Sequence, residues 1–162
     1  MSNLAQALGK KFIENQQEVR IRSFELGGHT FKVRVPLTVE ADATYARLKN
    51  IDTELLEKYY TELTKDLMAG KDEMPEEMDV KFIDNDVLVA GRSMREASRN
   101  KLMTEMRITE MVRLLVPEDK EFDMGTITYA DIDQLFPLPI QMQLVEKISE
   151  VISFDYGQTK EK

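Results

Sequence analysis

Apolar residues recur at every fourth position through the middle of this chain, and this spacing constrains its fold more than any other feature. The series is Ile51, Leu55, Tyr59, Leu63 and Leu67. Because an α-helix turns once in about 3.6 residues, these side chains lie along one side of a helix as a wide apolar stripe. The sequence predicts helix from Val39 to Ala69, either as two helices separated at Asn50 or as one bent helix. The stripe is expected to form core or interface.

Two later segments also have helical spacing. A long helix is predicted from Gly91 or Ser93 to about Leu115, and its apolar residues wrap most of its circumference, so it needs cover on several sides. The terminal helix is predicted to begin at Pro139, a residue suited to the first helical turn. Its narrow apolar face consists of Leu144, Val145, Ile148, Val151 and Ile152.

Two shorter helices are expected near the ends of the chain. Residues 3–15 have apolar side chains every four positions, and Ser2 can cap the free N–H groups at their start. Thr128 and Asp131 have the spacing of a capping box, which predicts a short helix ending at Pro137. The residues before it, 116–127, are expected to form a mobile loop.

Two segments alternate apolar and polar residues instead, which is typical of β-hairpins. The first begins at Val19, turns at Gly27-Gly28 and ends at Pro36, with a bulge expected near Ser23 where the alternation slips. The second pairs Val80-Lys-Phe-Ile with Asp86-Val-Leu-Val across the two-residue turn Asp84-Asn85. The fold class is therefore α+β, mainly helical, with long amphipathic helices and two β-hairpins that can share one antiparallel sheet.

The sequence gives little reason to divide the chain. We find no internal repeat, no low-complexity segment and no convincing linker, so residues 1–153 are predicted to form a single α+β domain. Residues 70–78, which have turn and charge composition without periodicity, are the one candidate seam. Residues 154–162 are predicted to be a disordered polar C-terminal tail.

The composition excludes several classes of protein. The 162 residues contain no cysteine, which excludes disulfides, thiolate zinc sites and cysteine nucleophiles. The apolar runs are too short to span a bilayer and the first fifteen residues lack the order of a secretory signal, so we expect a cytoplasmic protein with no membrane partner. The net charge of −8 disfavours nucleic acid as the partner, because binding to phosphates depends on Lys and Arg.

Candidate catalytic and metal-binding residues are few. His29 is the only histidine, so it has no second histidine to serve as base or ligand beside it. Asp84 and Asp86 resemble the start of a calcium loop, but Val89 and Arg95 stand where that loop needs glycine and glutamate. No glycine-rich phosphate loop occurs. We predict no catalytic residue, no metal site, no cofactor and no enzymatic activity; the alternative is an enzyme that uses two close, buried carboxylates alone.

Two charged clusters have competing interpretations. Asp131 and Asp133 project to different sides of a short helix, so capping is the expected role of Asp131. Four cations gather at the start of the long helix, where they form either a site for an anion or an acidic partner, or a solvated helix end. They are Arg92, Arg95, Arg99 and Lys101.

Methionine is unusually abundant, with ten residues. Its unbranched, polarisable side chain repacks against partners of varied shape, although any single methionine can equally fill a gap in a core. Together with the apolar face of the terminal helix, the methionines predict a surface that binds another protein or a second copy of the chain. The predicted partner-binding residues are Met94, Met103, Met106, Met111, Leu144, Val145, Ile148, Val151 and Ile152.

Two segments carry a pattern that points to a family. The first runs from Phe24 to Pro36, reads Phe-Glu-Leu-Gly-Gly-His-Thr-Phe-Lys-Val-Arg-Val-Pro, and precedes a helical region. The second runs from Asp131 to Ile148 and begins Asp-Ile-Asp-Gln-Leu-Phe-Pro-Leu-Pro. In these segments, and in the order of its elements over most of its length, the chain resembles the tail assembly chaperones of long-tailed bacteriophages.

The resemblance implies a partner and a place of action. Such a chaperone coats the long, apolar, helical tape-measure protein in the cytoplasm of the host cell while the tail tube polymerises around it. It is then shed, so it is expected to be absent from the mature virion. The family commonly also makes a C-terminally extended form by translational frameshifting. The alternative is a structural virion protein, such as a head–tail connector or a tail terminator, which forms a fixed ring and stays in the particle.

Overall fold

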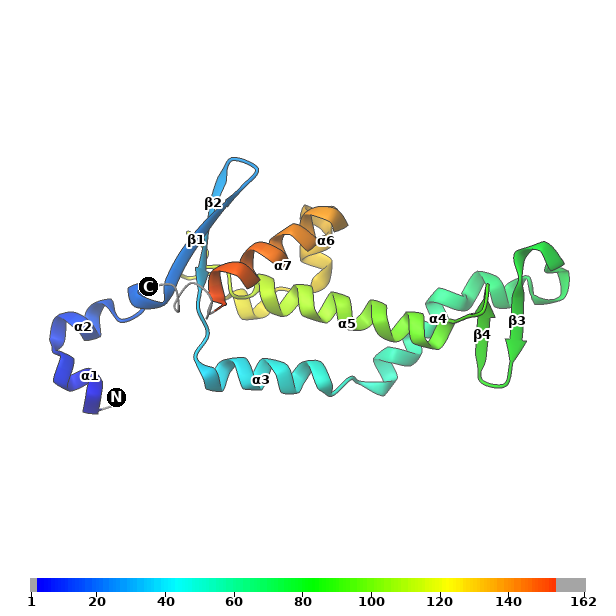
Figure 1. Cartoon of the computed structure of the whole chain (residues 1–162), viewed down its shortest axis with the longest axis horizontal. Helices are drawn as coiled ribbons and strands as arrows, with labels where there is room; N and C mark the ends of the chain where they lie inside the picture. The colour runs from blue at the N-terminus through cyan, green and yellow to red at the C-terminus, as the bar shows by residue number, and fades with distance from the viewer. Residues whose placement is uncertain (1–2, 154–162) are drawn as a thin grey trace, which may run out of the picture. The chain divides into compact units, whose positions relative to one another are not determined.

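The structure, a computed structural model that describes residues 3–153, is mainly helical with two small antiparallel sheets (Figure 1). Helix accounts for 62% of the structure, which confirms the predicted α+β class. The chain divides into two compact units. Unit 1 consists of residues 1–43 and 108–162, and unit 2 consists of residues 44–107.

Three predictions on domain organisation relate to this division in different ways. The single domain over residues 1–153 stays a prediction. The candidate seam at residues 70–78 lies inside unit 2, where the chain forms two short 3-10 turns. The predicted cap at Ser2 and residues 154–162, which were predicted to be a disordered tail, lie outside the described residues.

The first hairpin, in unit 1, pairs β1 (Ile21–Leu26) with β2 (His29–Arg34) in a regular antiparallel register. Ser23 lies directly opposite Lys32, so the predicted bulge at Ser23 is wrong. The reason is that Ile21 and Phe24, three residues apart in a regular strand, lie on opposite faces, so no extra residue is needed. Val19 lies in a 3-10 turn ahead of β1 and does not constrain the register.

The C-terminal helices pack against this hairpin and form one part of the core of unit 1. Helix α7 (Leu138–Ile152) lies against both strands, and α6 (Tyr129–Leu135) precedes it. The prediction placed the start of α7 at Pro139, one residue late, because Pro137 provides the N-cap position. The buried cluster between α7 and the hairpin consists of Phe24, Val33, Leu144 and Ile148.

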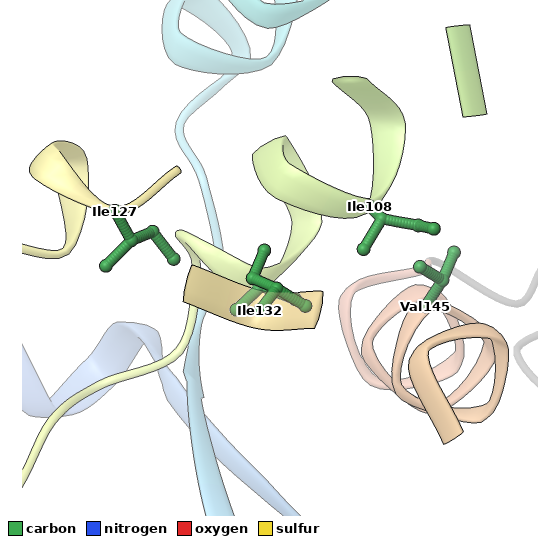
Figure 2. Packing of buried hydrophobic residues seen from close by; sticks show 5 residues of the cluster. Ile108, Ile127, Ile132 and Val145 are labelled. Atoms are coloured by element: carbon green, nitrogen blue, oxygen red, sulfur yellow. The ribbon is translucent and has the colours of Figure 1, made fainter. Parts of the chain in front are cut away.

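A second buried cluster lies beside the first and joins α5, α6 and α7. Its members are Ile108, Val112, Ile127, Ile132 and Val145. Figure 2 shows Ile108 and Val145 directed toward one another from α5 and α7. Both clusters belong to unit 1, since helix α5 (Met94–Val112) runs from unit 2 into unit 1 at residue 108.

The N-terminal segment forms two short helices instead of the single helix predicted over residues 3–15. They are α1 (Asn3–Leu8) and α2 (Lys10–Asn15). Gly9 separates them with a φ angle of 102°, a backbone conformation that glycine adopts without the steric penalty of a side chain.

The predicted break at Asn50 is confirmed, because the segment forms two helices. They are α3 (Thr38–Lys49) and α4 (Thr53–Ala69). The side chain of Asp52 caps α4 by accepting a hydrogen bond of 2.9 Å from the N–H of Glu54. Helix α3 begins at Thr38, one residue before the predicted start at Val39.

The second sheet belongs to unit 2 and has three strands. They are β3 (Val80–Ile83), β4 (Asp86–Val89) and β5 (Arg92–Ser93). The predicted pairing of β3 with β4 is confirmed, with Phe82 opposite Val87 and Val80 opposite Val89. The two hairpins form separate sheets, however, so a shared sheet is wrong. The free edge of β4 is taken by β5, which the tight turn at Ala90 and Gly91 brings back onto it.

Candidate functional site

A groove of about 600 Å³ opens on unit 1 between strand β2, the segment that follows α5, and helix α6. Strand β2 contributes His29, Thr30, Phe31 and Lys32. The segment after α5 contributes Leu115, Val116, Pro117, Glu118 and Lys120. The third wall consists of Met124, Ile127, Asp131, Ile132, Leu135 and Phe136, and the remaining lining residues are Glu18, Ile21 and Val112.

Backbone pairing positions the second wall of the groove. Leu115 lies opposite Val33 as an isolated antiparallel bridge, and the N–H of Val116 donates a hydrogen bond of 2.8 Å to the carbonyl oxygen of Lys32. Pro117 has no N–H, so it cannot extend this pairing along β2. The chain therefore leaves the sheet at Pro117 and forms a wall beside it.

The far end of the same segment is also attached. The guanidinium of Arg113 donates a hydrogen bond of 2.8 Å from Nη2 to the carbonyl oxygen of Ile127. Ile127 itself is buried in the core cluster of unit 1. Residues 116–127, predicted to form a mobile loop, are thus held at both ends, and this wall of the groove has a defined position.

The floor of the groove is apolar and continuous with the core. Ile132 is only 3% exposed and Val112 4% exposed, and both belong to the buried cluster. Phe31 stacks on Phe24, with ring centroids 5.3 Å apart. Because these side chains are fixed by packing from behind, the groove is preformed and presents an apolar surface of fixed shape.

Charged side chains of both signs also line the groove. They are Glu18, Lys32, Glu118, Lys120 and Asp131. Asp131 is already engaged, because its carboxylate accepts a hydrogen bond of 2.8 Å from the N–H of Thr128 in the capping box that the sequence predicted. His29 packs edge-on against Phe31, with ring centroids 4.6 Å apart, and is exposed. Mixed charges favour neither an acidic nor a basic ligand.

Among residues 3–153 no group of three or more histidine, aspartate or glutamate side chains could hold a metal ion. Asp133, the other half of the carboxylate pair considered from the sequence, accepts a hydrogen bond of 3.0 Å from the amide nitrogen of Gln141. The arrangement therefore suits binding of apolar side chains between charged edges.

The residues predicted to bind a partner lie elsewhere, and none of the nine lines the groove. Leu144 and Ile148 are fully buried and Val145 is 6% exposed, so these three are core residues, which corrects their assignment to a free surface. The physical reason is that hairpin β1–β2 covers this face of α7. Val151 and Ile152 are partly buried against the same cluster.

The predicted methionines are divided between the two units. Met111 is partly buried against both core clusters of unit 1. Met94 and Met106 are partly buried in unit 2, whereas Met103 is 39% exposed. Met124, which was not among the predicted partner-binding residues, lines the groove.

The groove was missed because its walls come from three segments far apart in the sequence, so no periodicity marks them. A signal was nevertheless present. The segments Phe24–Pro36 and Asp131–Ile148, which the sequence analysis singled out, contribute residues to two of the three walls. A pairing of these segments in space would have located the groove.

The basic cluster at the start of α5 is partly used within unit 2. Arg95 contacts Glu57, Tyr60 and Asn85, so it is not available as part of a free anion site. Burial raises the pKa of Tyr60 above its ordinary value, although the charge of Arg95 acts in the opposite direction. Burial also acts to raise the pKa of Asp86, but hydrogen bonds from Ser93 and from backbone N–H groups outweigh it, so this pKa is lowered.

Comparison of the chain with models of protein families, with curated proteins and with solved structures finds no match. Among the described residues, no helix has both the length and the apolar character needed to cross a membrane.

Proposed function

We propose that this chain is a non-enzymatic tail assembly chaperone, which binds and solubilises the tape-measure protein by taking apolar side chains of that protein into the groove of unit 1. The groove itself carries the proposal. It has an apolar floor, and its volume of about 600 Å³ is large enough for several side chains of a bound segment.

The lining of the groove fits an apolar helical partner better than a small polar ligand. An amphipathic helix binds a groove by inserting apolar anchors spaced one turn apart. Met124 gives the third wall an adaptable side chain, and Leu135, which is 72% exposed, gives the same wall an apolar edge. A long helical protein offers many similar segments, which such a surface can accept.

The resemblance supports the same assignment. The two segments that resemble tail assembly chaperones meet at the groove, one as strand β2 and the other as helix α6. On this proposal the protein acts in the cytoplasm of the host cell, binds the tape-measure protein in multiple copies and is absent from the mature virion. Self-association into a homo-oligomer is compatible with that role.

Substitution of Leu135 tests the role of the groove. We expect Leu135→Gln to move a co-expressed tape-measure protein from the soluble to the insoluble fraction, because an exposed apolar edge of the groove becomes polar. Leu138→Gln is the matched control, since Leu138 is 53% exposed but does not line the groove. Equal solubilisation by both variants would place the contact outside the groove.

The same proposal is distinguished from a structural virion protein by the fate of the chain. We expect mass spectrometry of purified virions to find none of it, and sedimentation of the isolated protein to find no fixed ring. A stable ring that is also present in purified particles would support a head–tail connector or a tail terminator and would overturn the chaperone assignment.

A further inference from the structure

Unit 2 has very little apolar core. Within residues 44–107, all of which the structure describes, Val87 and Leu102 are the buried apolar side chains. The other two buried residues are Thr64 and Ser98, whose hydroxyls donate to carbonyl oxygens one helical turn earlier. A unit of this length normally depends on a larger apolar cluster for its stability, so other contacts must hold its parts together.

One arginine, Arg95, joins three parts of this unit through its side chain. The guanidinium of Arg95 donates a hydrogen bond of 2.6 Å from Nη1 to Oε1 of Glu57 on α4. Two further hydrogen bonds reach Asn85, in the turn between β3 and β4. Nη2 donates one of 2.9 Å to the side-chain oxygen of Asn85, and Nε donates the other to its carbonyl oxygen. The central carbon of the guanidinium lies 3.9 Å from the ring centroid of Tyr60 on α4.

A neighbouring carboxylate joins the sheet to α5 but does not reach α4. Asp86 accepts hydrogen bonds from the backbone N–H of Val87, from the N–H of Arg95 and from the hydroxyl of Ser93. The sheet and the start of α5 are therefore linked by Asp86. Helix α4 is joined to them by the side chain of Arg95. Two contacts of Tyr59 with α5 add to this: its hydroxyl donates a hydrogen bond of 3.1 Å to Glu105, and Nζ of Lys101 lies 5.7 Å from its ring centroid.

We propose that Arg95, with Glu57, Tyr60 and Asn85, forms a clasp that closes unit 2, and that α4 opens from the sheet and α5 in a step separate from the unfolding of unit 1. This conformational device goes beyond the proposed chaperone function and does not depend on it. The clasp is partly exposed, with 29% of the Arg95 side chain and 61% of the Glu57 side chain accessible. Such contacts are individually weak, so opening is within thermal reach. Opening exposes the partly buried apolar side chains of α4.

Hydrogen–deuterium exchange of the full chain tests the clasp. We expect Arg95→Met to speed exchange of peptides from α4 by about tenfold and to leave peptides from α7 unchanged. Arg95→Lys keeps the charge but loses the planar fork, so its effect is expected to be intermediate. Arg99→Met is the matched control, because Arg99 is an exposed arginine one turn further along the same helix, and it should leave α4 unchanged.

Two results would overturn the proposal. One is unchanged exchange of α4 in Arg95→Met, and the other is faster exchange of α4 and α7 together, which would show a single cooperative unit. If Arg95→Met does not fold, hydrogen exchange of the unaltered chain at low and high salt is the test, because salt screens the Arg95–Glu57 ion pair. Raising NaCl from about 0.05 M to about 1 M should speed exchange in α4 and not in α7, and no response of α4 would refute the clasp.

Discussion

The hydroxyl of Tyr129 on α6 donates a hydrogen bond of 2.9 Å to the side-chain oxygen of Gln141 on α7. Gln141 is fully buried, and its amide nitrogen donates to Oδ1 of Asp133 and to the carbonyl oxygen of Phe136. Both polar atoms of the amide are therefore satisfied. This network fixes the corner between α6 and α7, and α6 in turn carries one wall of the groove.

We expect Gln141→Glu to destabilise unit 1 by about 1–3 kcal/mol at neutral pH, because it places a buried carboxylate next to the exposed carboxylate of Asp133. Protonation of the pair relieves the repulsion, so the loss should shrink as the pH falls toward about 4.5. Urea denaturation at both pH values measures it. Gln143→Glu, on the exposed side of α7, is the control and should show neither effect; an equal loss at both pH values would contradict the prediction.

Leu144 provides a test of the assignment of α7 to the core. Because this side chain is fully buried between α7 and hairpin β1–β2, Leu144→Ala should lower the free energy of unfolding by about 2–5 kcal/mol. Met142→Ala on the same helix, where Met142 is 48% exposed, should change it by less than about 0.5 kcal/mol. Small and similar losses in the two variants would indicate that this face of α7 is not core and is available to bind a partner.

The stability of unit 1 should depend on pH through the carboxylate of Glu40. The N–H of Leu37, together with the guanidinium of Arg20 at 2.7 Å, holds the pKa of Glu40 below its ordinary value, against partial burial that acts to raise it. A lowered folded pKa contributes stability above the unfolded value of about 4.3, and this contribution is lost as the pH falls through the folded pKa.

Glu40→Gln should therefore lower the free energy of unfolding at about pH 7, by about 0.5 kcal/mol after allowance for solvent screening of a half-exposed pair, and should have no effect near pH 2. Thermal unfolding over this pH range measures the difference. Glu25→Gln, an exposed glutamate of β1, is the control. A loss that persists unchanged in acid would show that the carboxylate charge is not its cause.

The backbone at Ala90 has a conformation that suits glycine better than alanine. Its φ angle is 51°, in the left-handed region that disfavours residues with a side chain. Ala90→Gly is expected to stabilise unit 2 by about 0.5–1 kcal/mol, measured by hydrogen exchange in β3 and β4. Ala97→Gly, inside helix α5, should instead destabilise by about 1 kcal/mol, and a loss of stability in both variants would contradict the argument.

Local chemistry explains which parts of the fold could be predicted. The capping box of Thr128 and Asp131 and the pairing of Phe82 with Val87 depend on neighbours within a few residues, and both predictions are confirmed. The bulge expected at Ser23 is absent because Ile21 does not have to share the core-facing side of β1 with Phe24. The division of residues 3–15 was missed because the φ angle of Gly9 is a backbone choice that helical spacing does not reveal.

The sequence by itself determined where helices and hairpins form, because spacing and capping act between residues close in the chain. Only the tertiary structure decided the use of each apolar face. The spacing of Leu144 and Ile148 shows that one side of α7 is apolar, but whether a partner or the chain itself covers it depends on Phe24 and Val33, more than a hundred residues earlier. The groove also depends on the tertiary structure, because its walls are adjacent only after hairpin β1–β2 and α6 have packed on a common core.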